Sequence, residues 1–173
     1  MPASIRPDKR APVALELLGE SPGVFSMHLL NETLLITWYG VSTLESTAAY
    51  DALCVQARKR FREPLACVHL LTVTVPRMPD AQTRDELTRV NQEHEVLVSA
   101  CAVVIPVAGF IGSALRGLVT AIVLKTQRTT QNLKIVGSAE AAVEWLAPAH
   151  QAATGKQLDA KALLAALQQL SAR

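Results

Sequence analysis

The sequence has few aromatic residues and little net charge. Only 4% of its 173 residues are aromatic whereas 50% are hydrophobic, so the core must consist mainly of Leu, Val, Ile and Ala. The formal net charge of +2 argues against a nucleic-acid binder that works by neutralising phosphates. A chain of this length corresponds to one ordinary domain, which can bury a core without disulfides or metals.

Cysteine is also scarce, and no Cys-x-x-Cys motif is present. Cys54, Cys67 and Cys101 are odd in number and far apart in the sequence, so we predict free, buried thiols in a reducing compartment. Cys67 and His69 lie two residues apart on an expected strand and therefore point to the same side. Burial predicts that this thiol is inert.

Catalytic and metal-binding signatures are absent from the sequence. There is no His-x-x-x-His or His-Glu-x-x-His for zinc, no Gly-x-Ser-x-Gly nucleophile turn and no phosphate-binding P-loop. We therefore predict no catalytic residue, no metal and no cofactor. The chain is expected not to be an enzyme.

One long apolar run, residues 101–124, carries a single charge, Arg116. It is long enough to cross a bilayer, but Pro106 and Gly109 would interrupt the helix, and Arg116 would be costly in lipid. We interpret the run as a strand (100–105), a glycine turn and a helix that ends near residue 127. The N-terminal residues show neither a signal peptide nor an anchor. These features predict a cytoplasmic protein with no stable membrane insertion.

The first half of the chain predicts a hairpin followed by a helix. Residues 23–29 and 34–39 resemble two strands across a polar turn. Ser42 and Glu45 have the spacing of a capping box, which would open a helix that ends near Phe61. The basic residues at the end of that helix suit its negative terminus, with a nucleic-acid patch as the alternative.

The second half predicts strands and helices in alternation. A β-rich run at 65–75 indicates a central strand, and Asp80 would cap a helix that extends to about Val98. Asp85 and Arg89 have the spacing of an ion pair on that helix. The remaining predicted elements are a strand at 133–136, a helix after Ser138 and a final amphipathic helix at 158–170.

This order of elements predicts an α/β fold. Helices between strands require a mostly parallel sheet with right-handed crossovers, and the opening hairpin makes one edge antiparallel. We expect a small sandwich, a mostly parallel mixed sheet with an antiparallel edge strand, flanking helices and an additional C-terminal helix. The predicted organisation is a flexible tail (1–13), one domain (14–150) and a C-terminal amphipathic helix (151–173).

Four stretches together resemble the STAS/SpoIIAA-like proteins of bacteria. They are LLITWYG followed by VSTLE, the strand ending near Thr74, AVVIPVAGFIGSALRGLVTAIVL, and KIVGSAEAAVEWL. The resemblance implies a SpoIIAA-like fold and a non-enzymatic, cytoplasmic domain that regulates or scaffolds through protein partners. In such relatives a hydroxyl in an Asp-Ser-Ser-Gly motif is phosphorylated. That motif is missing here, and Thr74 is the nearest hydroxyl.

Two kinds of site remain as predictions. Helix N-termini meet at the carboxyl ends of parallel strands, so a small anionic or lipid-like ligand would bind there, close to Arg77, Gly109, Gly112 and Ser113; a structural turn is the alternative. The helix after the glycine turn has a narrow polar stripe, so it lies in the core or packs against a partner, which favours a homodimer. Its expected interface residues are Phe110, Leu115, Leu118, Val119 and Ile122.

Overall fold

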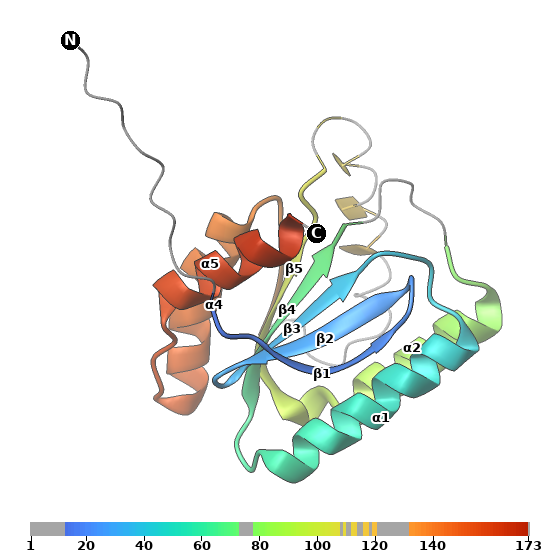
Figure 1. The fold of residues 1–173 in the computed structure, drawn as a ribbon, viewed down its shortest axis with the longest axis horizontal. Coiled ribbons are helices and arrows are strands. Elements are labelled where there is room, and N and C mark those ends of the chain that lie inside the picture. Colours follow the sequence, from blue (N-terminus) through green and yellow to red (C-terminus); the bar gives the residue numbers. More distant parts are fainter. Residues whose placement is uncertain are drawn as a thin grey trace.

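In a computed structural model of the chain, the protein forms one mixed sheet covered by helices on both faces (Figure 1). The structure describes residues 13–72, 78–107, 109, 112–113, 116–117, 119–120 and 132–172. The sheet has six strands in the order β1-β2-β3-β4-β5-β6, so neighbours in the chain are also neighbours in the sheet. The predicted α/β architecture, with its mostly parallel sheet, antiparallel edge and C-terminal helix, is confirmed.

The elements follow one another in this order along the chain. The strands are β1 (Glu16–Ser21), β2 (Phe25–Leu30), β3 (Thr33–Trp38), β4 (Leu65–Leu71), β5 (Val98–Val104) and β6 (Leu133–Val136). The helices are α1 (Leu44–Arg60), α2 (Ala81–Glu93), α4 (Ala139–Thr154) and α5 (Ala160–Ser171), with a 3-10 turn η1 (Glu95–Leu97) before β5.

The antiparallel edge contains one more strand than the sequence predicted. β2 and β3 form the expected hairpin, but β1 pairs antiparallel with β2 along its outer side. Residues 16–21 escaped prediction because their sequence, ELLGES, does not alternate between apolar and polar residues. As an edge strand, β1 is largely exposed and needs little apolar sequence.

The parallel part of the sheet determines which helices share a face. β3, β4, β5 and β6 are parallel and each crossover advances by one strand. Because such crossovers are right-handed, α1 and α2 must lie on the same face, and Figure 1 shows them side by side there. α4 and α5 cover the opposite face (Figure 1).

The helix caps correct one prediction and support another. α1 begins one residue later than the Ser42–Glu45 pattern indicated: Thr43 is the N-cap and Ser46 completes the capping box. Ser42 and Thr43 both offer a hydroxyl as the N-cap, and in the structure the Thr43 hydroxyl accepts from the backbone of Ser46. Asp80 caps α2 as predicted, with its carboxylate accepting from the backbone of Thr83 at 2.8 Å.

α2 is shorter than predicted, and its ion pairs differ from those expected. The helix ends at Glu93, and β5 already begins at Val98. Arg89 pairs with Glu86 and Glu93 on its own helix and with Asp51 on α1, rather than with Asp85. Glu86 and Glu93 lie three and four residues from Arg89, and Asp85 also lies four residues away, so helical spacing alone could not identify the partner. The contact with Asp51 depends on the packing of α1 against α2.

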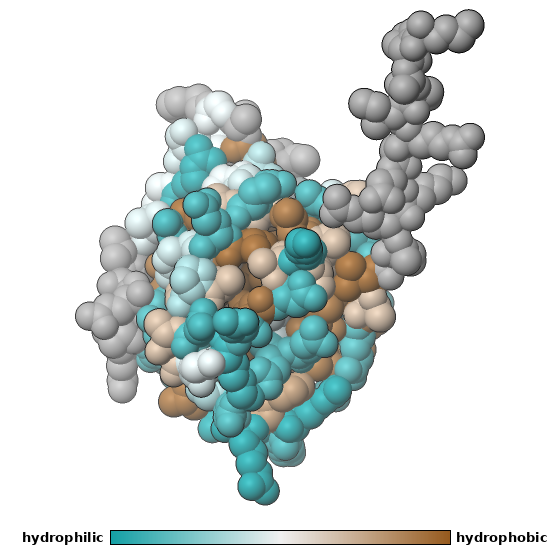
Figure 2. Space-filling model, turned by 90° about the vertical axis from the view of Figure 1, so that its left-hand side faces the viewer, coloured by the Kyte–Doolittle hydropathy of each residue, from teal (hydrophilic) through white to brown (hydrophobic). Residues whose placement is uncertain are grey.

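The face under α4 and α5 is filled mainly by aliphatic side chains, with His150 of α4 also fully buried, 2.7 Å from the hydroxyl of Ser99. Leu163, Leu167 and Leu170 of α5 are buried against Leu146 of α4 and the sheet, so the last helix packs on its own chain. Gly155 ends α4 with a φ of 76°, a left-handed conformation that suits glycine. Figure 2 views the molecule from this side, where hydrophilic residues surround hydrophobic ones.

The apolar run at 101–124 begins as the predicted buried strand. Cys101 to Val104 form the end of β5, whose residues pair with both β4 and β6. Within the part of the chain that the structure describes, no helix combines the length and apolar character that crossing a membrane requires.

Candidate functional site

The predicted glycine turn is held together by its own side chains. A Cβ at Gly112 would collide with the carbonyl oxygen of Val107, so this position requires glycine. Arg116 donates to that same oxygen at 3.2 Å and to the hydroxyl of Ser113 at 3.3 Å. Gly109 has a φ of 73°. These contacts favour the structural turn over the ligand site, which remains a prediction.

Most of the other predicted site residues lie outside the described part of the chain. These are Arg77, Thr74, Phe110, Leu115, Leu118 and Ile122. Val119 is described, is half-buried and packs against the core on the α1 side. The predicted interface therefore stays a prediction.

A cavity of about 380 Å³ lies between the sheet and the helices on the α1 side. Its wall is mainly apolar, with Met27, Leu34 and Ile36 from the hairpin and Leu97, Val103 and Leu133 from the other side. Tyr50 and all three cysteines also line it. Residues far apart in the sequence thus meet at one internal surface.

Polar side chains from the end of α2 and from η1 line another part of this cavity. They are Asn91, Gln92, His94 and Glu95, and Asn132 joins them from the far side. His94 is 4% exposed, and its Nε2 lies 2.6 Å from a carboxylate oxygen of Asp51. This bond, and a further one from Arg89, hold the pKa of Asp51 below its ordinary value. His94 Nδ1 is buried without a hydrogen-bond partner among the described residues.

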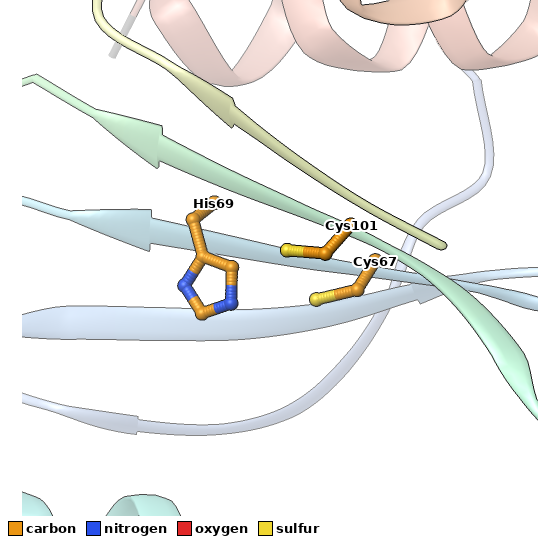
Figure 3. Close-up of side chains that lie close together, drawn as sticks. All are labelled: Cys67, His69 and Cys101. Atoms are coloured by element: carbon orange, nitrogen blue, oxygen red, sulfur yellow. The ribbon is translucent and has the colours of Figure 1, made fainter. Parts of the chain in front are cut away.

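Two cysteines and a histidine form a compact cluster on the cavity floor (Figure 3). Cys67 and His69 come from β4, and Cys101 lies directly opposite Cys67 on β5. Their sulfur atoms and one imidazole nitrogen all lie within 4.8 Å of one another. In Figure 3 the three side chains leave the sheet on the side away from α4.

Trp38 fixes the proton of the His69 ring. Its indole Nε1 donates to Nδ1 of His69 at 3.0 Å, and the two rings are within 7° of parallel. Because the indole nitrogen can only donate, Nδ1 must accept, and the proton of the neutral imidazole is on Nε2. One ring nitrogen faces the two sulfurs in Figure 3, so His69 presents an N–H donor to them.

The three thiols have different acidities. A hydrogen bond from the Cys67 thiol, opposed by burial and assisted by His69, lowers the pKa of Cys101 to about 5. The same bond, together with burial, raises the pKa of Cys67 well above its usual value. Burial raises the pKa of Cys54 to about 12. The hydrogen bond between the two side chains thus favours the anionic form on Cys101 rather than on Cys67, and burial favours the neutral thiol at Cys54.

The same cluster has the donor types of a thiophilic metal site. Two thiolates and one imidazole match the ligands of some catalytic zinc centres. A metal on Nε2, however, would move the imidazole proton to Nδ1, where it would face the N–H of Trp38. The hydrogen bond from Trp38 therefore favours an Nε2–H group that donates to the two sulfurs. It disfavours coordination of a metal ion by Nε2.

The Cys67–His69 pair lies on one strand as the sequence predicted, and burial with a raised pKa of Cys67 agrees with the predicted inert thiol. The sequence did not indicate that these side chains also line a cavity. Cys101 was placed on a strand, but its register with Cys67 depends on tertiary pairing. The sequence feature that could have indicated this cluster is the Cys-x-His pattern on one central strand together with a cysteine on the next strand.

Comparison with known proteins gives no relative from which to transfer a function. No family model, no curated protein and no solved structure matches the chain.

Proposed function

We propose that the protein binds a small, mainly apolar molecule in the cavity between the sheet and α1. The observation that carries this proposal is the cavity itself, with a volume of about 380 Å³. Ligand pockets are typically about 300–1,000 Å³, with apolar walls and a few placed polar groups. In this cavity the apolar wall consists of aliphatic side chains, and the placed polar groups are the side chains of Asn91, Gln92, His94 and Glu95.

The polar end of such a molecule would lie next to His94. Asp51 accepts from Nε2 of this histidine, so Nδ1 carries a lone pair in the neutral ring. Nδ1 is buried and has no partner among the described residues, which is costly unless another group supplies the bond. An amphipathic occupant with a hydroxyl or carboxyl group would supply it.

The proposal is tested with two probes, anilinonaphthalene sulfonate in solution and decanoate in native mass spectrometry. We expect the unmodified protein to bind both, with decanoate displacing the dye. The variant Val103→Phe should reduce binding at least about tenfold, because the larger ring occupies cavity space. Val96→Phe is the matched control, since Val96 is 70% exposed and does not line the cavity.

Two results would contradict ligand binding in this cavity. One is the absence of binding of either probe to the unmodified protein. The other is an equal effect of Val103→Phe and Val96→Phe, which would place the probe on the outer surface.

A second candidate function is a STAS/SpoIIAA-like, non-enzymatic interaction domain in the cytoplasm, with a second copy of the chain as its partner. Its support is the topology, an antiparallel hairpin followed by parallel strands added one at a time, together with the resemblance described above. Light scattering after size exclusion tests it. A dimer that dissociates in Leu118→Glu supports the proposal, and a monomer at all concentrations contradicts it.

A further inference from the structure

The register of the sheet places two cysteines opposite each other. Cys67 pairs with Cys101 on adjacent parallel strands, and both side chains enter the cavity. Neighbouring strands are about 4.8 Å apart, and disulfides join Cα atoms about 4.4–6.8 Å apart. The spacing of paired strands thus falls in the range of disulfide Cα distances, and the two sulfur atoms already lie within 4.8 Å of each other.

His69 is positioned to stabilise a thiolate at this pair. Trp38 fixes its proton on Nε2 through the 3.0 Å bond to Nδ1, so an N–H donor faces the sulfurs. Donors of this kind favour the anionic form of a thiol, which is the nucleophilic form. The pKa of Cys101 is lowered first by the hydrogen bond from Cys67 and, to a smaller extent, by His69.

The cavity gives small molecules a place beside the sulfurs. Both cysteines are almost completely buried, with 2% and 8% exposure, yet both line the same cavity. A thiolate beside a second thiol is the arrangement in which oxidation ends in a disulfide rather than in higher oxides.

We propose that Cys67 and Cys101 are a redox-active dithiol that a hydroperoxide oxidises to a disulfide, with His69 as a positioning residue. The Cys101 thiolate attacks one peroxide oxygen, an S–O bond forms, and the O–O bond breaks. The leaving alkoxide takes a proton from water, and Cys101 becomes a sulfenic acid. The Cys67 sulfur then attacks the Cys101 sulfur, the S–S bond forms, and the hydroxyl leaves as water with the Cys67 proton.

In balance, one hydroperoxide and two thiols give one disulfide, one alcohol and one water. The dithiol is oxidised by two electrons, and the peroxide is reduced by two. This inference uses the cavity as a route for the oxidant. It does not depend on the amphipathic occupant proposed above.

The test treats the 173-residue chain with hydrogen peroxide in the presence of a chelator, blocks free thiols and maps disulfides by peptide mass spectrometry. We expect a loss of two hydrogen atoms and a linked peptide pair containing Cys67 and Cys101. Cys54 should stay unlinked and become available for blocking only after unfolding, because burial keeps it a neutral thiol.

The role of His69 is tested by Trp38→Phe, which removes the donor that fixes the imidazole proton. At about pH 6 we expect disulfide formation to slow about two- to tenfold, because raising the Cys101 pKa from about 5 by one to two units leaves about half to a tenth of it as thiolate at that pH. The rate should recover at higher pH. Trp145→Phe is the matched control, since Trp145 packs on the opposite face.

Three results would overturn the proposal. They are a disulfide that includes Cys54, oxygen addition at Cys101 without a bond to Cys67, and no oxidation faster than that of the unfolded chain. Equal rates for the two tryptophan variants would overturn the positioning role of His69. Dye binding by the unoxidised protein is measured separately. A protein that binds the dye but forms no disulfide contradicts only the dithiol proposal, and one that forms the disulfide but binds no dye contradicts only the ligand proposal.

Discussion

The two faces of the sheet differ in what they bury. Under α4 and α5, mainly aliphatic and alanine side chains fill the space, as Leu35, Val68 and Ala102 illustrate, together with the buried polar pair of Ser99 and His150. Under α1 and α2 the same strands present Cys67, His69 and Cys101 to a cavity. Because successive residues point to opposite faces, one pleated sheet carries a largely aliphatic layer on one side and the cysteine–histidine cluster beside a cavity on the other.

Deleting residues 157–173, which removes α5 from the packed face, should have the largest effect on stability. The deletion removes three leucines of α5 that are at most 1% exposed. At about 1.5–3 kcal/mol for each buried side chain, the loss approaches the whole stability of a typical domain, about 5–15 kcal/mol. We expect no cooperative unfolding transition by circular dichroism. Deletion of residues 2–12, within the predicted tail (1–13), is the control, and equal effects of both deletions would contradict the packed role of α5.

A matched pair of substitutions on β3 compares the faces directly. Leu35 contributes to the packed face, and its neighbour Leu34 lines the cavity. We expect Leu35→Ala to lower the free energy of unfolding by about 3–5 kcal/mol and Leu34→Ala by about 2 kcal/mol, because a side chain beside a void loses fewer contacts. Urea denaturation measures both values. A larger loss for Leu34→Ala would show that the cavity side is the better packed one.

Larger side chains on β5 should destabilise the protein more on the packed face than on the cavity side. Ala102→Leu adds volume to the packed face, and we expect a loss of about 1–3 kcal/mol in the free energy of unfolding. Val103→Leu adds volume on the cavity side, where room exists, and should change it by less than about 1 kcal/mol. Thermal and urea unfolding of both variants measure the difference. Equal losses would indicate that the cavity is filled in solution.

The smallest predicted effect concerns the thiols and leaves the fold intact. Iodoacetamide should modify Cys101 at neutral pH, with a rate that falls only as the pH approaches about 5, where the thiolate becomes protonated. Cys54 should react in the folded protein only toward pH 12. Peptide mass spectrometry after short labelling measures both rates. Cys54 modified before Cys101 would contradict the assigned acidities.

The fold could largely be predicted from the sequence, whereas the site could not. Strand runs such as 133–136 and caps such as Asp80 and Ser138 are local signals, and the structure confirms them. β1 was missed because an exposed edge strand needs no alternating pattern. The cluster of Cys67, His69 and Cys101 depends on the register between β4 and β5, which local sequence does not encode.

The cavity was beyond sequence analysis for a related reason. Whether apolar residues such as Leu34 and Val103 meet or leave a gap depends on the distance between helix and sheet. The bond from Trp38 to His69 likewise joins β3 to β4. Both features arise only when the layers come together.

The consecutive strand order also affects how the chain is made. Each strand pairs with the one synthesised just before it, so the partner of a strand is already made when that strand leaves the ribosome. The sheet can therefore grow while the chain leaves the ribosome, with α1 and α2 already in place on one side. The other side, including Leu35 and Ala102, stays uncovered until residues 139–171 emerge at the end of translation. We expect nascent chains that lack these residues to need chaperone protection on that side.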